Sequence, residues 1–177
     1  DLHPPLLFKE GWLPDFPQEF ATAVEELDLS GNALVTLPHN VNILKKLRCL
    51  FLGGPAPGES STGRPNRFVS LPSLASLECL EHLSVHDTLL QVLPPLPMSL
   101  RTLRVDRCPL QHSSLEEEFI VLPPLTTLHL DGCTNIHGTA ERPDLLPRAI
   151  KRLEASLEDL QLPDGFHLGH FFGTPLS

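Results

Sequence analysis

A short aliphatic pattern recurs six times along this chain and constrains its fold more than any other feature. It consists of an aliphatic residue, two variable residues, a leucine, one variable residue and a second aliphatic residue, numbered here as positions one to six. The alternation at positions four and six puts two aliphatic side chains on one face of a strand. A single strand cannot bury this face, so the copies are expected to stack into a parallel sheet over a shared leucine core. The six copies span residues 24–29, 47–52, 80–85, 100–105, 125–130 and 150–155.

The spacing of the copies is typical of one family. Between successive central leucines, from Leu27 to Leu153, the intervals are 23, 33, 20, 25 and 25 residues. Four of the five fall in the range of leucine-rich repeats, and the chain resembles the leucine-rich-repeat superfamily over residues 24–162. The resemblance implies an α/β solenoid, a curved array of about six repeats with a parallel concave sheet and a mostly irregular convex side.

Two further segments refine this resemblance. Residues 96–103 and 146–153 share the form L-P-x-x-[LI]-[RK]-x-L, which is similar to repeats of plant immune receptors and bacterial effectors. The second segment also fits an amphipathic helix over residues 147–160, because aliphatic residues recur at i, i+3, i+7 and i+10 from Ile150. We favour a sixth repeat there and keep the helix as the alternative.

Position nine of the family's motif is an asparagine or cysteine, and the asparagine side chain satisfies backbone groups where the chain leaves the strand. Pro55 and Glu158 depart from this pattern, so unusual turns are expected in repeats two and six. Cys108 and Cys133 are expected to be buried thiols, while Cys49 should face outward. The six residues counted at position nine are Asn32, Pro55, Thr88, Cys108, Cys133 and Glu158.

Three segments interrupt or flank the repeats. The loop at residues 53–66 is rich in Gly, Pro and Ser, and is either a projecting recognition loop or a tolerated surface insertion. It begins like a phosphate-binding loop, but Glu59 stands where a lysine is needed, which excludes nucleotide binding. The arm at residues 1–23 and the tail at residues 163–177 carry aromatic residues that either cap the repeats or dock on a partner.

Charge and composition exclude several function classes. The net charge is −9, and no basic stripe is present to follow nucleic-acid phosphates. No apolar run reaches the ~20 residues of a membrane span. Four dispersed cysteines and no N-x-[ST] sequon favour an intracellular location. The chain starts at Asp1 rather than Met, which we interpret as removal of a segment and which makes an organellar, mitochondrial location an option.

The sequence carries no motif of a catalytic, metal or cofactor site. His82 and His86 are four residues apart on a strand, roughly 13 Å, which is too far for one metal ion. His86, Asp106 and Asp131 share position seven in consecutive repeats, where they either hold a cation or are solvated polar residues. We therefore expect no cofactor, no small-molecule substrate and no enzyme activity.

Positions three, five and seven should face the concave side, where we predict a protein-binding surface centred on Phe51, His86, Arg104 and His129. The opposing interpretation is a solvated face, with the real contacts on the loop and tail. The predicted function is a non-catalytic interaction module, an accessory or structural subunit of a larger assembly; the alternative is the ligand-sensing part of an immune receptor or bacterial effector. The predicted contact residues are Asp28, Phe51, Ser84, His86, Arg104, Asp106, His129 and Asp131 on the face, and Arg64, Arg67, Phe171 and Phe172 on the loop and tail.

Overall fold

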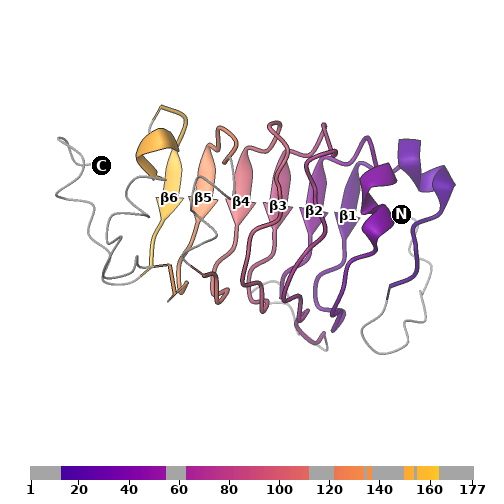
Figure 1. The fold of residues 1–177 in the computed structure, drawn as a ribbon, viewed down its shortest axis with the longest axis horizontal. Coiled ribbons are helices and arrows are strands. Elements are labelled where there is room, and N and C mark those ends of the chain that lie inside the picture. Colours follow the sequence, from indigo (N-terminus) through magenta and orange to yellow (C-terminus); the bar gives the residue numbers. More distant parts are fainter. Residues whose placement is uncertain are drawn as a thin grey trace.

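The protein contains a six-stranded parallel sheet with few helices, an α/β-type arrangement. The computed structural model describes residues 13–54, 63–111, 122–133, 135–136, 150–153 and 155–163, and the structural statements below concern these residues. The strands follow one another across the sheet in chain order (Figure 1). They are β1 (Glu26–Asp28), β2 (Cys49–Phe51), β3 (His82–Ser84), β4 (Thr102–Arg104), β5 (Thr127–His129) and β6 (Asp159–Gln161).

The register aligns the central leucines of all six strands. Leu27 pairs with Leu50, and the same pairing continues through each strand to Leu160. In the four inner strands this leucine is at most 2% exposed, whereas Leu27 and Leu160 are only partly buried. An end strand has a neighbour on one side only, which leaves its leucine less covered.

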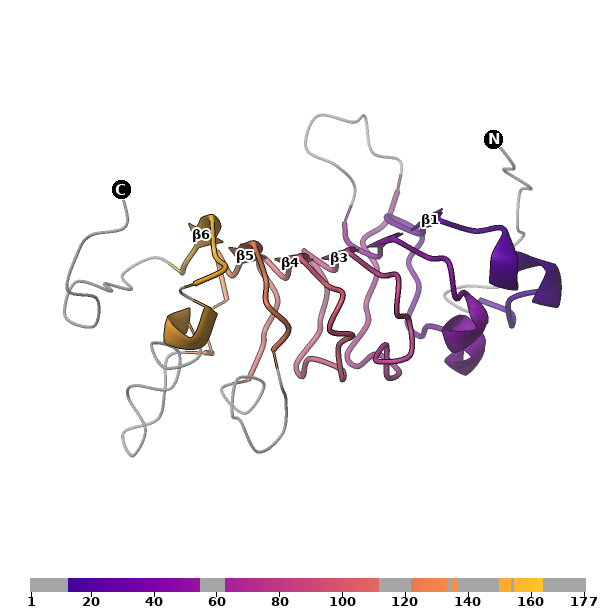
Figure 2. The ribbon, with the colours of Figure 1, turned by 90° about the horizontal axis from the view of Figure 1, so that it is seen from above.

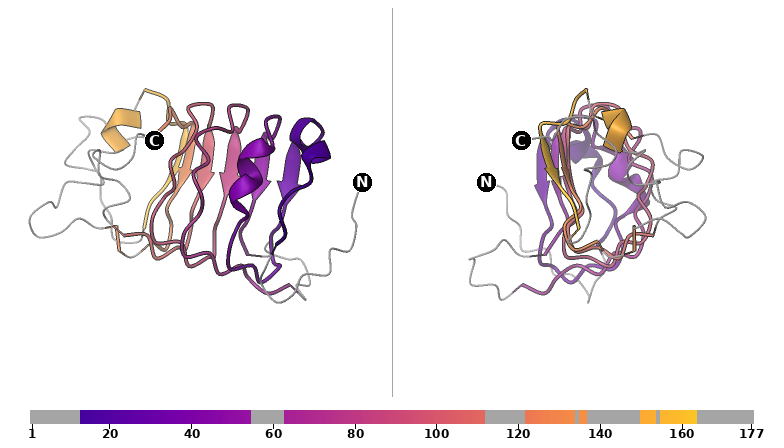
Figure 3. Two further views of the ribbon diagram at one scale, coloured as in Figure 1. Left: turned by 45° about the vertical axis from the view of Figure 1, so that its right-hand side comes forward. Right: turned by 90° about the vertical axis from the view of Figure 1, so that its left-hand side faces the viewer.

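The sheet forms one side of the molecule, and the segments that return from each strand to the next form the other side (Figures 2 and 3). The leucine core lies between these two layers. Two 3-10 helices, η1 (Gln18–Thr22) and η2 (His39–Ile43), lie near β1, and residues 150–153 are helical. The other described return segments are irregular.

The sixth repeat was predicted at the wrong residues. The described residues of the motif at residues 150–155 form no strand; residues 150–153 are helical, as the alternative interpretation held for part of this segment. β6 lies further along the chain, within a second copy of the motif that runs from Leu157 to Leu162. Ile150 and Leu153 satisfy the spacing of both a helical turn and a strand motif, and only the residues after them decide between the two.

The position-nine side chain of repeat two is Asn66 rather than Pro55. Asn66 is 1% exposed, and its Oδ1 accepts hydrogen bonds from the backbone N–H groups of Asn32 (3.2 Å) and Leu34 (2.8 Å). Its Nδ2 donates to the carbonyl oxygens of Leu29 and Leu52, both at 2.8 Å. The insertion therefore lies inside the motif, before position nine.

The later position-nine side chains serve the same purpose with fewer bonds. Thr88 Oγ1 donates to the carbonyl oxygen of Val85 at 2.9 Å. The thiols of Cys108 and Cys133 are buried and free, as predicted, and donate to the carbonyl oxygens of Val85 (3.1 Å) and Val105 (3.0 Å). A small polar side chain at this position thus bonds to the backbone where the chain leaves the strand.

The N-terminal arm continues the leucine core beyond β1. Leu13 and Phe16 are buried, and Phe20 packs against the same core. Asn40 holds the arm in place, because its side-chain amide bonds to both the N–H (3.0 Å) and the carbonyl oxygen (2.9 Å) of Phe16. The first twelve residues of the arm, and the tail beyond residue 163, lie outside the described residues.

Candidate functional site

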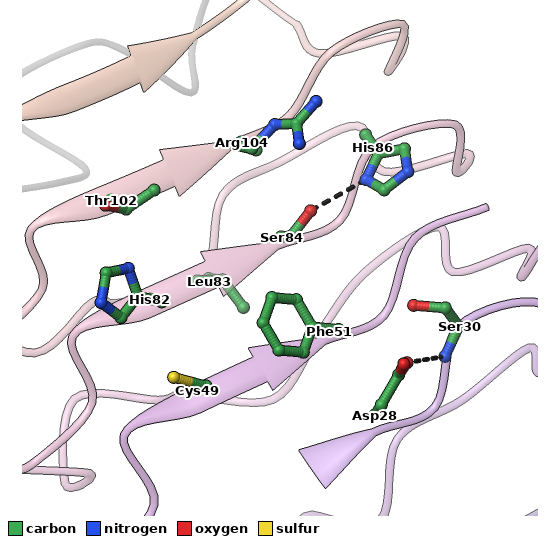
Figure 4. A pocket seen from close by; sticks show the side chains of 10 residues that line it. All are labelled: Asp28, Ser30, Cys49, Phe51, His82, Leu83, Ser84, His86, Thr102 and Arg104. Carbon is green, nitrogen blue, oxygen red and sulfur yellow. Dashed lines mark hydrogen bonds between the residues drawn. The ribbon is translucent and has the colours of Figure 1, made fainter. Parts of the chain in front are cut away.

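A groove of about 510 Å³ opens on the face of the sheet that points away from the leucine core (Figure 4). We call this face the outer sheet face. The groove crosses the first four strands and receives side chains from positions three, five and seven of their repeats. Its lining residues are Asp28, Ser30, Cys49, Phe51, His82, Leu83, Ser84, His86, Thr102 and Arg104.

Phe51 is the aromatic residue of this groove. It ends β2 and lies half-buried between the side chains of β1 and β3 (Figure 4). Alternation along the strand explains its position, because Leu50 points into the core and its neighbours must point outward. An exposed aromatic surface within a groove is typical of a binding anchor.

His86 is held against a glycine and a serine. A Cβ atom on Gly53 would lie 2.5 Å from the imidazole ring of His86, so the glycine at position seven of repeat two makes room for this ring. The Nδ1 atom of His86 lies 2.8 Å from the hydroxyl oxygen of Ser84. Burial, followed by the positive charge of Arg104, lowers the pKa of His86 from its usual 6.5, so the imidazole is neutral at pH 7.

Arg104 forms the positively charged end of the groove. Its Nε and Nη2 atoms donate to Oδ2 of Asp106, each at 3.3 Å. The Asp106 side chain is 3% exposed, but that of Arg104 is 43% exposed. The carboxylate therefore fixes the guanidinium from below, and the guanidinium presents its donors to solvent.

Asp28 forms the opposite, negatively charged end. It is exposed at the end of β1, and its Oδ1 accepts a hydrogen bond from the Ser30 N–H at 2.8 Å. Glu26, on the same strand and the same face, is also exposed. Between the charged ends lies the thiol of Cys49, whose pKa is raised mainly by burial and then by the charge of Glu26.

Five of the eight predicted face residues line this groove: Asp28, Phe51, Ser84, His86 and Arg104. The other three lie outside it. Asp106 and His129 are 2% and 9% exposed, so they are buried rather than presented to a partner, and Asp131 is half-buried. Oδ1 of Asp106 and Nδ1 of His129 are buried without a hydrogen-bond partner among the described residues.

Burial of His129 follows from its pairing with the strand that the sequence missed. Its Nε2 lies 2.8 Å from Oδ2 of Asp159, which β6 brings beside β5. Prediction of the sixth repeat at residues 150–155 put Arg152 in this place instead. When the motif is placed at residues 157–162, Asp159 occupies position three, and the sequence then identifies it as the neighbour of His129.

The predicted loop residues do not line the groove. Arg64 and Arg67 are exposed but do not line it. The backbone of Arg64 forms a parallel bridge with Asn32, and the Arg67 N–H donates to the carbonyl oxygen of Leu34 at 2.7 Å. Phe171 and Phe172 lie outside the described residues.

The groove also contains residues that were not predicted as contacts. Cys49, His82, Thr102 and Ser30 occupy positions three and seven, which the repeat numbering already assigned to this face. Leu83 is a core residue that reaches the groove from below. The positional pattern could have identified the first four, but no sequence signal distinguishes the strands that make the groove from those beyond it.

Neither a metal site nor a membrane span is found in the described part of the chain. Its His, Cys, Asp and Glu side chains, including His86, Asp106 and Asp131, form no group of three or more that could hold a metal ion. No helix there has the length and apolar character that crossing a membrane requires.

Comparison with protein-family models, with curated proteins and with solved structures found no match to this chain.

Proposed function

We propose that this protein is a non-catalytic interaction module that binds a protein partner in the groove around Phe51, as an accessory subunit of a larger intracellular assembly. The observation that carries the proposal is the groove itself, an opening of about 510 Å³ with a half-buried phenylalanine among its lining residues and an arginine at one end whose side chain is 43% exposed. Aromatic residues and arginine are enriched among the residues that dominate binding energy at protein interfaces.

We propose further that the module is a leucine-rich-repeat solenoid. Three features support this assignment. The strands follow one another in chain order, their central leucines form one continuous ladder, and the position-nine side chains bond to the backbone. In such an array each repeat contacts only its neighbours and offers its outer strand residues as a preformed surface.

The one arrangement in the groove that suggests catalysis is the Ser84–His86 pair, and its geometry favours a structural role. Ser84 is 5% exposed, so its hydroxyl has little access to a substrate. Among the described residues, the carboxylate oxygen nearest to the ring is Oδ2 of Asp87, which lies 4.0 Å from Nε2 of His86, beyond hydrogen-bond distance. The hydroxyl instead orients the ring against Gly53.

Quantitative affinity purification of the full chain, with Phe51→Ala and Arg104→Ala variants, tests the proposal. Wild-type protein should co-purify with a partner at fixed stoichiometry, and each variant should lose most of that partner without a change in its own unfolding temperature. Met98→Ala is the matched control, because Met98 is 59% exposed and does not line the groove. A partner that both groove variants retain as well as the control does would refute the proposal.

A further inference from the structure

The two ends of the groove carry opposite charges, and the separation between them is fixed by the sheet. Asp28 lies on β1 and Arg104 on β4, with β2 and β3 between them (Figure 4). Three interstrand steps of about 4.8 Å separate these strands by about 14 Å. Phe51 lies one step from the acidic end. Any occupant that spans the groove therefore meets a carboxylate, an aromatic ring and a guanidinium in that order.

The basic end can accept a further carboxylate. Nε and Nη2 of Arg104 bond to the buried Asp106, and Nη1 has no hydrogen-bond acceptor among the described residues. With a side chain 43% exposed, the outer edge of the guanidinium is accessible. A carboxylate at this edge would form charge-assisted hydrogen bonds, which are about twice as strong as neutral ones.

The acidic end can accept a cation. Oδ1 of Asp28 is used by the Ser30 N–H, but the side chain is exposed and Glu26 adds a second carboxylate on the same strand. Between these two ends, the half-buried ring of Phe51 gives the groove an apolar surface. A basic group at one end, an apolar group at the centre and an acidic group at the other end would match these three surfaces.

An extended peptide presents such groups at the required distance. Residues i, i+2 and i+4 lie on one face of an extended chain, and i and i+4 are about 13 Å apart. We propose that the groove binds an extended segment of the protein partner that carries a basic residue, an apolar residue and an acidic residue at alternate positions, with the basic residue at Asp28 and the acidic residue at Arg104. This inference rests on the proposed function and specifies the partner that it requires.

Binding of short peptides to the full 177-residue chain tests this inference. The probe is an acetylated, amidated nonapeptide of alanine and serine with lysine, leucine and glutamate at its third, fifth and seventh positions, measured by isothermal titration calorimetry. The control peptide carries the same three residues side by side, which sends the leucine to the opposite face. The alternating peptide should bind at least about fivefold more tightly than the control.

Charge-reversal variants test which peptide residue binds at each end of the groove. Arg104→Glu should weaken binding of the lysine–leucine–glutamate peptide by about tenfold, and a peptide with lysine in place of the glutamate should recover it. Asp28→Lys should behave in the same way towards a peptide with glutamate in place of the lysine. Lys46→Glu is the matched control, because Lys46 is exposed beside β2 but does not line the groove, and it should leave the affinity unchanged.

The two exposed or half-exposed thiols report where the peptide lies. Cys49 lines the groove, whereas Cys79 is exposed and does not line it. Bound peptide should slow alkylation of Cys49 by iodoacetamide and leave alkylation of Cys79 unchanged. This measurement does not depend on any variant and therefore stands even if a charge reversal unfolds the protein.

Absence of peptide binding, equal affinity for both peptides, or unprotected Cys49 would overturn the inference. The natural partner then separates its failure from that of the proposed function. If the co-purified partner still depends on Phe51 and Arg104, the groove binds a protein with a different pattern of charges. If neither the partner nor the peptide depends on these residues, both proposals are wrong.

Discussion

At the scale of single residues, Asn32 in repeat one and Asn66 in repeat two differ more than their sequence context suggests. Asn32 occupies position nine by direct counting, yet it is exposed, and its side-chain Nδ2 donates to the carbonyl oxygen of Ser30 at 2.9 Å. Asn66 is buried and bonds to four backbone groups. The turn after β1 accounts for this difference between the two asparagines, because Ala33 has a left-handed φ of 55° and its N–H donates to the carbonyl oxygen of Arg64.

Asn66→Ala is expected to lower the free energy of unfolding by about 2–4 kcal/mol, because it leaves buried backbone donors and acceptors without partners. Asn32→Ala is the matched control and should change it by less than about 0.5 kcal/mol, since the lost hydrogen bond is exposed. Denaturation by urea, followed by circular dichroism, measures both. Equal effects would contradict the role assigned to Asn66.

A second prediction concerns Asp87 and Arg107, which both have left-handed φ values at position eight. Two hydrogen bonds of 2.6 Å from Arg107 lower the pKa of the Asp87 carboxyl below its usual 3.8. Because the folded pKa is the lower one, the pair stabilises the fold above the unfolded pKa of about 3.9, and this contribution is lost as the pH falls below it.

NMR titration of the Asp87 carboxyl should show this shift, and Arg107→Ala should move the pKa back towards 3.8. The unfolding free energy of the variant should depend less on pH than that of the wild type between about pH 4 and pH 2. Asp87→Asn should remove the same dependence, which separates this pair from the other acidic residues. A titration curve that Arg107→Ala leaves unmoved would argue against the ion pair.

At the scale of secondary-structure elements, five strands were predictable and the sixth was not. In β1 to β5, a single copy of the motif fits each strand, and the alternation of leucines fixes its register. Near β6, two copies of the motif follow each other closely, at residues 150–155 and 157–162, and the first has the i, i+3 spacing that a helical turn also satisfies. Pairing with β5, a long-range contact, selects the second copy, and no local pattern contains that information.

A double-mutant cycle tests the register of β6. His129 and Asp159 are 2.8 Å apart, so His129→Gln and Asp159→Asn should show a coupling energy of about 0.5–1 kcal/mol in urea denaturation. Glu158→Gln is the control, because the neighbouring exposed carboxylate makes no bond to His129 and should show no coupling. Coupling to Glu158 in place of Asp159 would mean that β6 is shifted by one residue.

At the scale of the whole molecule, position in the repeat determines what a residue can do. The predicted face residues up to the end of β4 line the groove. Asp106, which is buried two residues after β4, does not line it, and neither do His129 and Asp131 on and after β5. The sequence identified the face because the face depends on alternation alone. It did not identify the groove, because the groove depends on side-chain volume across neighbouring strands, such as the absence of a side chain at Gly53.

Stability should depend on the leucine ladder and not on the surface charges. Arg48, just before β2, and Glu81, just before β3, form an ion pair of 2.8 Å, but their side chains are 55% and 38% exposed. Exposed pairs of this kind contribute about 0–1 kcal/mol. A fully buried leucine contributes about 1.5–3 kcal/mol, and the core contains such a residue in each inner strand.

Central and terminal leucines should therefore differ in what they stabilise. Leu103→Ala, in β4, removes a side chain with 0% exposure and strands on both sides, and should lower the unfolding free energy by about 3–5 kcal/mol. Leu27→Ala, the same substitution in β1, affects a partly buried site with one neighbouring strand and should cost about 1–2 kcal/mol. Urea denaturation of both variants, with amide hydrogen exchange, measures this difference. Exchange should be slowest in β3 and β4 and fastest in β1 and β6, because end strands can open without separating the rest of the core. Equal losses for the two variants, with uniform exchange across the sheet, would contradict a core that is built by stacking neighbouring repeats.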